Sequence, residues 1–244
     1  MPVELVAALA ALAFFGSIVF GATGFGAALI AIPLATHLVP LEFALALFVL
    51  ADLGNAYSVG LENPRNAVRA DLRRLVPMIL LGTAAGVTVL VNLPRSLGML
   101  LLGSFVIAYA LYSLFSHEYR RPIAAAWGWL AGFLGGVTSA LFGAGGPPYV
   151  IYLSQRGLSK EEFRATLGLV TMTSISLRTV AFFLTGVLLD LQVWIAAAFV
   201  VPAALAGIAV GRKIFFKMQK NLLMRAIALL LLASGGSLVW RALH

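Results

Sequence analysis

A positively charged side chain occurs within one of the apolar segments of this sequence. Arg178 lies in a segment that we predict over residues 165–186, far from the charged residues at either flank. An ionisable side chain at membrane depth is costly and usually functional. A guanidinium is a planar, two-pronged donor whose geometry matches carboxylate, sulfonate or sulfite oxygens. Arg178 is therefore a candidate substrate-binding residue for a small anion.

Asp52 is the acidic residue that we place deep inside a predicted span, midway along residues 41–60. One interpretation is a structural ion pair with Arg178. Another is a coupling role, in which a substrate anion competes with Asp52 for the arginine, or protonation of Asp52 releases it. The two interpretations are compatible, and Asp52 is the candidate coupling residue.

Two glycine-rich runs interrupt apolar segments: GATGFG at residues 21–26 and GAGGPP at residues 143–148. Proline is preferred in the first turn of a helix, so a helix is expected to begin at the second run. A helix that starts after a break directs its free N–H groups and positive dipole end at the break, which suits an anion. The candidate residues of these breaks are Gly24, Gly26, Gly143, Gly145 and Gly146. Close helix packing is the alternative, and it is our interpretation for Gly16, Gly82, Gly86, Gly132 and Gly207.

Hydroxyl and amide side chains near these features complete the candidate site. Those at or just before the breaks are Thr23, Thr138 and Ser139, and those near the middles of two spans include Asn55 and Ser174. They can donate to substrate oxygens, although Ser and Thr in membranes often bond to backbone or to a neighbouring helix. The histidines have no metal-ligand spacing. We therefore predict no catalytic residue, no metal and no cofactor.

The composition indicates that these residues are positioned by membrane helices. The 244-residue chain is 61% hydrophobic and 11% charged, whereas soluble domains are about 25% charged. Backbone in lipid must satisfy its own hydrogen bonds, so the spans must be helical, and we predict an all-α polytopic bundle. The predicted segments are 3–20, 25–38, 41–60, 75–92, 96–115, 124–141, 147–156, 165–186, 191–210 and 222–240. The second and seventh are too short to span comfortably, and each is expected to be a half-helix or a short tilted helix.

The two halves of the sequence resemble each other. Glycines of the breaks, together with Gly16 and Glu42, match residues of the second half at an offset of 119. The motif that begins at Pro77 matches the motif that begins at Pro202 at an offset of 125, as do Arg95 and Lys220. We therefore predict a duplication, with one transmembrane repeat at 1–116 and a second at 124–244.

The charges predict how the repeats are oriented. The net charge is +8, but no basic stripe with interleaved aromatics suggests nucleic-acid binding. Most basic residues fall in four short connections, 61–74, 116–122, 156–164 and 211–225, which the positive-inside rule places in the cytoplasm. Both termini then lie outside. Equivalent connections of the two halves differ in charge, so the repeats are inverted, each with a glycine-broken helix pair and three spans. Such repeats support alternating access.

The sequence resembles the TauE/SafE family of anion permeases, also called the sulfite exporter family. The resemblance is carried by the run from Gly21 to Gly26 followed by Pro33 and Leu34, and by the second-half glycines from Gly135 to Gly146 with Pro147. It covers essentially the whole chain. The second motif ends in two prolines, and Ala27 and Ala28 stand where a tighter glycine run is more typical. The resemblance implies transport, often export, of sulfite, organosulfonates or related sulfur-containing anions. We expect a secondary transporter in the bacterial cytoplasmic membrane.

Several alternatives stay open at this level. An anion channel with the same site, or a permease for small carboxylates, fits the same residues. A membrane enzyme would need a catalytic cluster, which the predicted spans do not contain. A role as a subunit of a larger complex is less consistent with a complete duplication. The expected partners are a small anionic substrate and the lipid bilayer. The sequence leaves the transport direction, the coupling ion and a homodimer undecided.

Overall fold

The computed structural model describes residues 1–115, 123–215 and 220–243. These residues form ten α-helices and one short 3-10 turn, and no β-strand occurs among them. The elements are α1 (Val3–Thr23), α2 (Ala27–Ala35), α3 (Leu41–Gly60), η1 (Pro64–Asn66), α4 (Arg69–Asn92), α5 (Arg95–Phe115), α6 (Trp127–Phe142), α7 (Gly146–Ser154), α8 (Lys160–Leu184), α9 (Leu191–Phe215) and α10 (Lys220–Leu243). By length and composition, α1, α3, α4, α5, α8 and α9 can cross a membrane. The predicted polytopic helical fold is confirmed.

Two helices begin earlier than the hydrophobic pattern predicts. We expected spans from residues 75 and 165, whereas α4 begins at Arg69 and α8 at Lys160. Before α8, the Ser159 hydroxyl accepts from the Glu162 N–H at 3.2 Å, and the Glu162 carboxylate accepts from the Ser159 N–H at 2.9 Å. This reciprocal cap stabilises the first turn without apolar residues. Hydropathy alone therefore truncates helices whose first turn is polar.

The helices α2 and α7 are half-helices, as the sequence predicts. Each has nine residues, which corresponds to about 14 Å of helix against about 30 Å of hydrocarbon. Eight of the nine residues of α2 are buried, and Pro33 lies inside it. This short helix is therefore enclosed by the bundle rather than by lipid.

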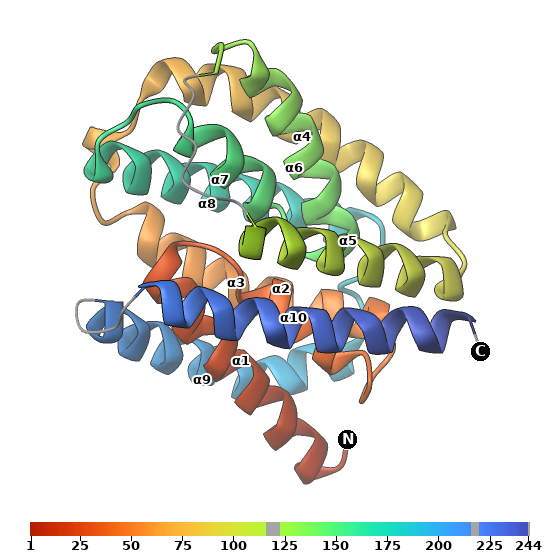
Figure 1. The fold of residues 1–244 in the computed structure, drawn as a ribbon. Coiled ribbons are helices and arrows are strands. Elements are labelled where there is room, and N and C mark those ends of the chain that lie inside the picture. Colours follow the sequence, from red (N-terminus) through yellow and green to blue (C-terminus); the bar gives the residue numbers. More distant parts are fainter. Residues whose placement is uncertain (116–122, 216–219, 244) are drawn as a thin grey trace.

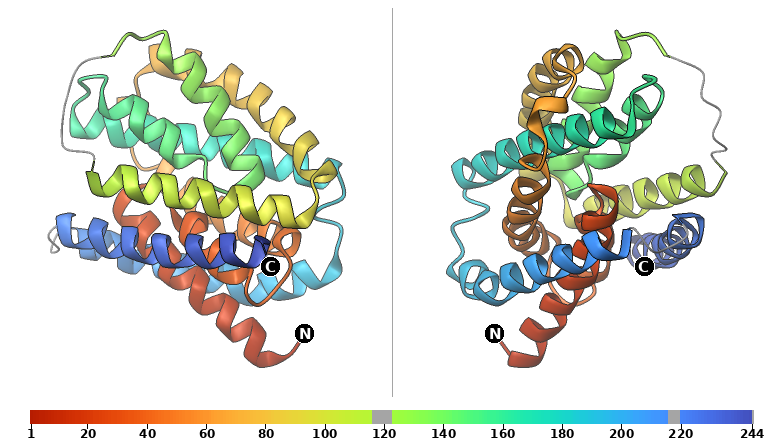
Figure 2. Two further views of the ribbon diagram at one scale, coloured as in Figure 1. Left: turned by 45° about the vertical axis from the view of Figure 1, so that its right-hand side comes forward. Right: turned by 90° about the vertical axis from the view of Figure 1, so that its left-hand side faces the viewer.

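Helices from the first half of the chain pair with helices from the second half (Figure 1). The helix α1 packs on α9, α4 packs on α6, and α5 and α10 lie side by side across the middle of the bundle. Figure 2 shows the same pairing from two further directions. The outer surface carries large apolar side chains, as lipid contact requires, among them Phe15, Leu80, Phe183, Phe199 and Leu229.

Glycines allow two of these helix pairs to approach closely. A Cβ on Gly82 would lie 2.1 Å from the Phe133 carbonyl oxygen, and one on Gly207 would lie 2.2 Å from the Phe14 carbonyl oxygen. Phe14 and Phe133 are 119 positions apart and the two glycines 125 apart, which are the offsets found in the sequence. The packing role of the non-break glycines is confirmed, since Gly16, Gly86 and Gly132 also meet neighbouring backbone.

Ion pairs gather basic connections at one end of the bundle. Glu62 contacts Arg164 at 3.1 Å and Arg212 at 3.0 Å, which joins the connection before α4 to the start of α8 and the end of α9. The start of α1 and the end of α10 both lie away from these connections, toward the opposite side of the bundle (Figure 1). Three basic residues used in the charge argument, Arg120, Arg121 and Lys217, fall outside the described residues. Among the described residues, basic connections and chain ends thus occupy opposite sides.

Candidate functional site

Both helix breaks begin with a glycine in the left-handed region. The helix α1 ends at Gly24, whose φ is 84° and whose N–H donates to the Phe20 carbonyl at 2.7 Å. The helix α6 ends at Gly143, whose φ is 69° and whose N–H donates to the Ser139 carbonyl at 2.9 Å. A side chain at such a cap would be strained, which explains the glycines. The two glycine-rich runs therefore end α1 and α6, and the half-helices α2 and α7 begin just after them.

The two breaks lie against each other, as the site hypothesis requires. A Cβ on Gly143 would lie 2.4 Å from Ile32 Cδ1 and 3.0 Å from Ala28 Cβ. A Cβ on Gly146 would lie 2.5 Å from the ring of Phe25, which belongs to the first break. Residues more than a hundred positions apart thus meet inside the bundle.

Arg178 lies beside the second break and pairs with Asp52. Its Nη2 donates to Asp52 Oδ2 at 2.9 Å, and its Nη1 donates to the Ser139 carbonyl oxygen at 3.0 Å. Arg178 is fully buried and Asp52 is 3% exposed. The predicted ion pair is present, so the cation in the bundle is balanced. The Nε of Arg178 is buried without a partner among the described residues, which leaves one donor of the guanidinium unused.

A small cavity lies between the breaks and contains part of the predicted site. Of the residues named from the sequence, those that line it are Gly26, Asp52, Ser139, Gly143, Gly145, Gly146 and Ser174. Its free space corresponds to about one water molecule, and sulfite is larger. Arg178 is not part of the lining, but its guanidinium donates to Asp52 and to the Ser139 carbonyl, and both residues line the cavity. An anion can enter only when the surrounding helices separate.

Two serine hydroxyls in this cavity have protons that no described acceptor receives. Most hydroxyls of α8 donate to a carbonyl of the preceding turn, as Thr171, Thr173 and Thr179 do. Ser174 instead accepts from the Tyr149 hydroxyl at 3.0 Å, and its own proton has no partner in the described part of the chain. The Ser139 hydroxyl likewise has none, and both serines are 1% exposed. Both can donate to a guest in the cavity.

The two half-helices differ in the donors that they offer, which corrects the sequence prediction. We expected both to present free N–H groups. At α2, the first helical bond is that from Ile30 N–H to the Gly26 carbonyl at 3.3 Å, so the N–H groups of Ala27 and Ala28 face the break unpaired, as usual for a first turn. The first turn of α7 contains Pro147 and Pro148, which have no N–H. The donors therefore come mainly from α2.

Besides Arg178, four predicted residues do not line this cavity. The Thr23 hydroxyl lies 2.9 Å from the Val19 carbonyl and 2.7 Å from the Phe25 carbonyl, and the Thr138 hydroxyl donates to the Leu134 carbonyl at 2.9 Å. Asn55 Nδ2 donates to Ser17 Oγ at 2.7 Å. Gly24 forms the turn itself. These polar side chains therefore bond to groups within the bundle, which is the alternative considered from the sequence.

Sequence reasoning missed Tyr149 and Asp71. Tyr149 is fully buried and lines the cavity. Its position directly after the two prolines that begin a half-helix could have identified it as a candidate site residue. We expected Asp52 and Arg178 to be the charged groups inside spans and assigned Asp71 to the connection 61–74. The structure places Asp71 in the first turn of α4, fully buried.

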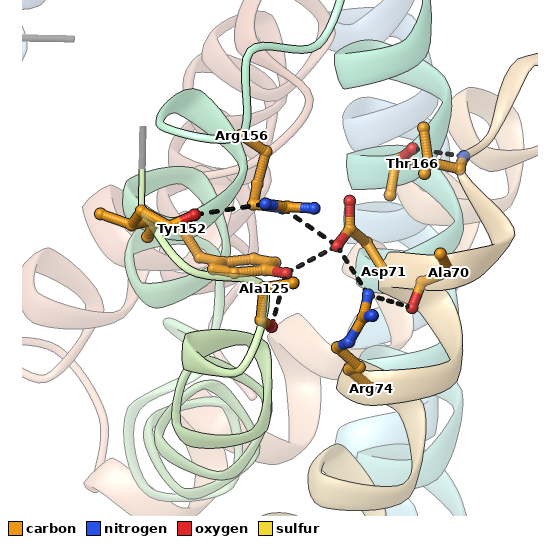
Figure 3. A network of polar contacts seen from close by, with 9 residues as sticks. Ala70, Asp71, Arg74, Ala125, Tyr152, Arg156 and Thr166 are labelled. Atoms are coloured by element: carbon orange, nitrogen blue, oxygen red, sulfur yellow. Dashed lines mark hydrogen bonds and ion pairs between the residues drawn. The ribbon is translucent and has the colours of Figure 1, made fainter. Parts of the chain in front are cut away.

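Asp71 joins α4 to the end of α7 (Figure 3). Its Oδ1 accepts from the Tyr152 hydroxyl at 2.6 Å and contacts Arg156 Nε at 3.2 Å and Arg74 Nη1 at 3.5 Å. The Tyr152 hydroxyl also lies 3.1 Å from the Ala125 carbonyl, just before α6. The cluster fixes α4, α6 and α7 together at the end where the basic connections lie.

A smaller cluster lies near the chain termini. Arg241 Nη1 lies 3.1 Å from the Thr36 carbonyl and 3.0 Å from His37 Nδ1. Because a guanidinium can only donate, His37 Nδ1 must accept and the imidazole is neutral. Burial first, and the charge of Arg241 second, lower the pKa of His37. The cluster attaches the end of α2 to α10.

Comparison with known proteins yields two matches. The family model described as sulfite exporter TauE/SafE matches residues 9–238. A curated protein of Comamonas testosteroni, described as probable inner membrane transporter protein TsaS, is 25% identical over 202 residues, which cover 80% of this chain and 83% of that protein. No solved structure matches the chain.

Proposed function

The chain belongs to the TauE/SafE family of membrane transporters, and from this premise we propose that it is a secondary transporter that exports small sulfur-containing anions. It is an integral membrane protein and not an enzyme. Sulfite and organosulfonates are the proposed substrates. The observation that carries this proposal is the cavity between the two helix breaks, which contains unused hydrogen-bond donors and adjoins a buried guanidinium.

The anion is bound mainly by neutral donors. The Ser139 and Ser174 hydroxyls and the first N–H groups of α2 converge on the cavity, and the dipole of α2 adds a favourable potential. Asp52 lines the same cavity and repels an anion while it is ionised. Substrate entry therefore favours displacement or protonation of Asp52, which frees Arg178 to donate to the substrate. Asp52 is the coupling residue in this scheme.

Transport proceeds by alternating access between two inverted repeats, 1–116 and 124–244. The matching glycine contacts of Gly82 with Phe133 and of Gly207 with Phe14 support this division, because they join equivalent elements of the two repeats. The small free space of the cavity supports it too, since it holds about one water molecule and a substrate needs the helices around it to move. The basic end of the bundle faces the cytoplasm by the positive-inside rule, and both termini lie outside. The inner membrane is the proposed location, as the description of the Comamonas relative suggests.

An anion channel is the second candidate. A channel requires a continuous pathway with weak, multiple sites, whereas the cavity described here has free space for about one water molecule. The small free space therefore favours a transporter. Electrical recording separates the two functions, because large unitary currents contradict alternating access.

The proposal is tested with purified protein in proteoliposomes loaded with sulfite, an alkane sulfonate or acetate. We expect counterflow of labelled sulfite that exceeds the counterflow of acetate and of empty liposomes. The Thr179→Val variant is a suitable control, because that hydroxyl donates to the Ile175 carbonyl at 2.8 Å and is used within α8. Folded protein that moves none of these anions, or that prefers acetate, contradicts the proposed substrate class.

A further inference from the structure

A second cavity adjoins the one that contains the candidate site. It lies between α1, α2, α5 and α10 and is lined mainly by apolar side chains, with Thr23, Tyr109 and Ser113 as its polar members. Ser113 is two residues from the end of α5, so this cavity extends toward the connection 116–122. By the charge pattern, that connection lies at the cytoplasmic side.

The two cavities share two residues, Phe25 and Gly26. Gly26 has no side chain, so Phe25 is the shared residue that presents a side chain at this junction. Phe25 is 8% exposed and its ring packs on Gly146, where an added Cβ would lie 2.5 Å from the ring. The ring thus connects the first break to the start of α7.

The backbone around Phe25 allows the ring to move without unwinding a helix. Phe25 lies between the end of α1 and the start of α2, flanked by Gly24 and Gly26 with φ of 84° and 95°. Thr23 holds it in place, since the Phe25 N–H donates to Thr23 Oγ1 at 3.3 Å. Thr23 therefore positions the aromatic ring and has a role that the substrate-contact hypothesis did not assign.

The corresponding place in the second half of the chain is built differently. At the offset of 119, Phe25 corresponds to Ala144. Nearby, Phe142 stacks on Phe105 with ring centroids 5.4 Å apart, and neither ring lines the cavities beside Phe25. One side of the site thus has a single ring in front of a cavity, and the other side has a packed aromatic pair.

We propose that Phe25 is the gate between the substrate cavity and the cytoplasmic side, and that its ring must leave Gly146 before an anion can pass. This inference rests on the proposed transport function and adds the residue that closes one access route. A single apolar ring excludes water and ions from the route until it moves. In the structure described here the gate is shut, and the second cavity marks the route on its cytoplasmic side.

Thiol accessibility tests this gate without assuming a substrate. The sequence contains no cysteine, so a Thr171→Cys variant carries one reporter thiol. Thr171 lines the substrate cavity, but its hydroxyl donates to the Leu167 carbonyl within α8. The reaction of the thiol with the membrane-impermeant anion 2-sulfonatoethyl methanethiosulfonate is measured in vesicles of each orientation, and an Asn63→Cys variant identifies the face with the basic connections. Adding Phe25→Ala should raise the labelling rate from that face about tenfold, equivalent to about 1.4 kcal/mol in the opening equilibrium.

Phe142→Ala is the matched control, because Phe142 is a phenylalanine of similar burial, 6% exposed, beside the other break. It should leave labelling from the basic face unchanged. A Phe25→Leu variant, which preserves more of the packing, should give a smaller increase and serves if Phe25→Ala does not elute as a folded protein. Unchanged labelling in both Phe25 variants, or an equal increase in Phe142→Ala, overturns the gate.

Failure of the gate is distinguishable from failure of the proposed function. Methanesulfonate, which does not react with thiosulfonates, should slow labelling of the Thr171→Cys variant in a concentration-dependent way if the cavity binds sulfonates. Labelling that responds to Phe25→Ala but not to methanesulfonate supports the gate and contradicts the proposed substrate class. Labelling that methanesulfonate slows but Phe25→Ala leaves unchanged supports the substrate class and contradicts the gate.

Discussion

Removal of Arg178 should destabilise the protein chiefly through the charge that it leaves behind. Asp52 is almost fully buried, and its Oδ2 lies 2.9 Å from the guanidinium. An Arg178→Met variant preserves an unbranched apolar stem but leaves a buried carboxylate without its partner. An Asp52→Asn variant similarly leaves a buried cation. Each single variant therefore exposes the desolvation penalty of one ion.

The expected size follows from measured buried pairs. Removal of one partner of a buried ion pair costs about 3–5 kcal/mol. For a chain of this size that corresponds to a decrease on the order of 10 °C in melting temperature. The double variant Asp52→Asn/Arg178→Met contains no uncompensated charge, so it should lose less than the sum of the two single variants, with a coupling energy on the order of 3 kcal/mol.

The assay is thermal unfolding of the detergent-solubilised protein, followed by the fluorescence of its four tryptophans. Sulfite counterflow is measured on the same four proteins. We expect the double variant to recover stability but not transport, because the cation of the site is missing. Additive losses of stability would refute the pairing described here, and retained transport in the double variant would refute the role of Arg178 in binding.

Three further predictions concern the cavity, the packing and the pH dependence. In a thermal-shift titration, Ser139→Ala and Ser174→Ala should each weaken sulfite binding about tenfold or more, because each removes a hydrogen bond to a charged group worth about 1.5–3 kcal/mol. The Thr179→Val control should bind sulfite normally. Unchanged affinity in both serine variants would contradict the site. Gly207→Ala should lower the melting temperature, because its Cβ would lie 2.2 Å from the Phe14 carbonyl oxygen and overpacking costs about 1–3 kcal/mol. Gly236→Ala should not lower it, because a Cβ there would have nothing within 4 Å. Equal losses in the two variants would refute the close packing. The pKa of folded His37 lies below its ordinary value of 6.5, so the unfolded chain binds the proton first as the pH falls. The stability associated with this residue is therefore present above pH 6.5 and is lost as the pH falls through the folded pKa. His37→Gln should flatten the change in melting temperature between neutral and acidic buffer, and an identical profile would contradict the neutral imidazole.

Much of the central arrangement could be predicted because membranes restrict where charges and backbone breaks can occur. A guanidinium in a span needs a counter-charge, and Asp52 was the suitable partner within the predicted spans. The glycines of the breaks could be recognised because few other residues end a helix in the left-handed region. The half-helices α2 and α7 followed from the length of apolar sequence between these breaks and the next polar connection.

Other features depend on side-chain geometry that the sequence does not encode locally. Thr23, Thr138, Ser139 and Ser174 look equivalent as hydroxyls at breaks or within spans, yet the first two donate to carbonyls and the last two do not. A backbone acceptor is always within reach of a helical hydroxyl, so the choice depends on rotamer and neighbours. Asp71 was misplaced because a polar first turn resembles a connection when hydropathy alone defines the span.

The two prolines of α7 illustrate a different limit. Pro147 and Pro148 indicated a helix start correctly, but the same residues remove the donors that the anion hypothesis required there. The asymmetry between the half-helices was therefore already present in the sequence. It became informative once the first turn of α2 and the serine hydroxyls were found on the same cavity.

Direct observation of the bound anion tests the account most sharply. The protein would be crystallised with selenite, a sulfite mimic whose selenium scatters anomalously. We expect the anomalous peak between the two breaks, with oxygens within hydrogen-bond distance of the Ser139 and Ser174 hydroxyls and the Ala28 N–H. A peak elsewhere in the bundle, or an empty cavity at saturating selenite, would contradict the proposed site.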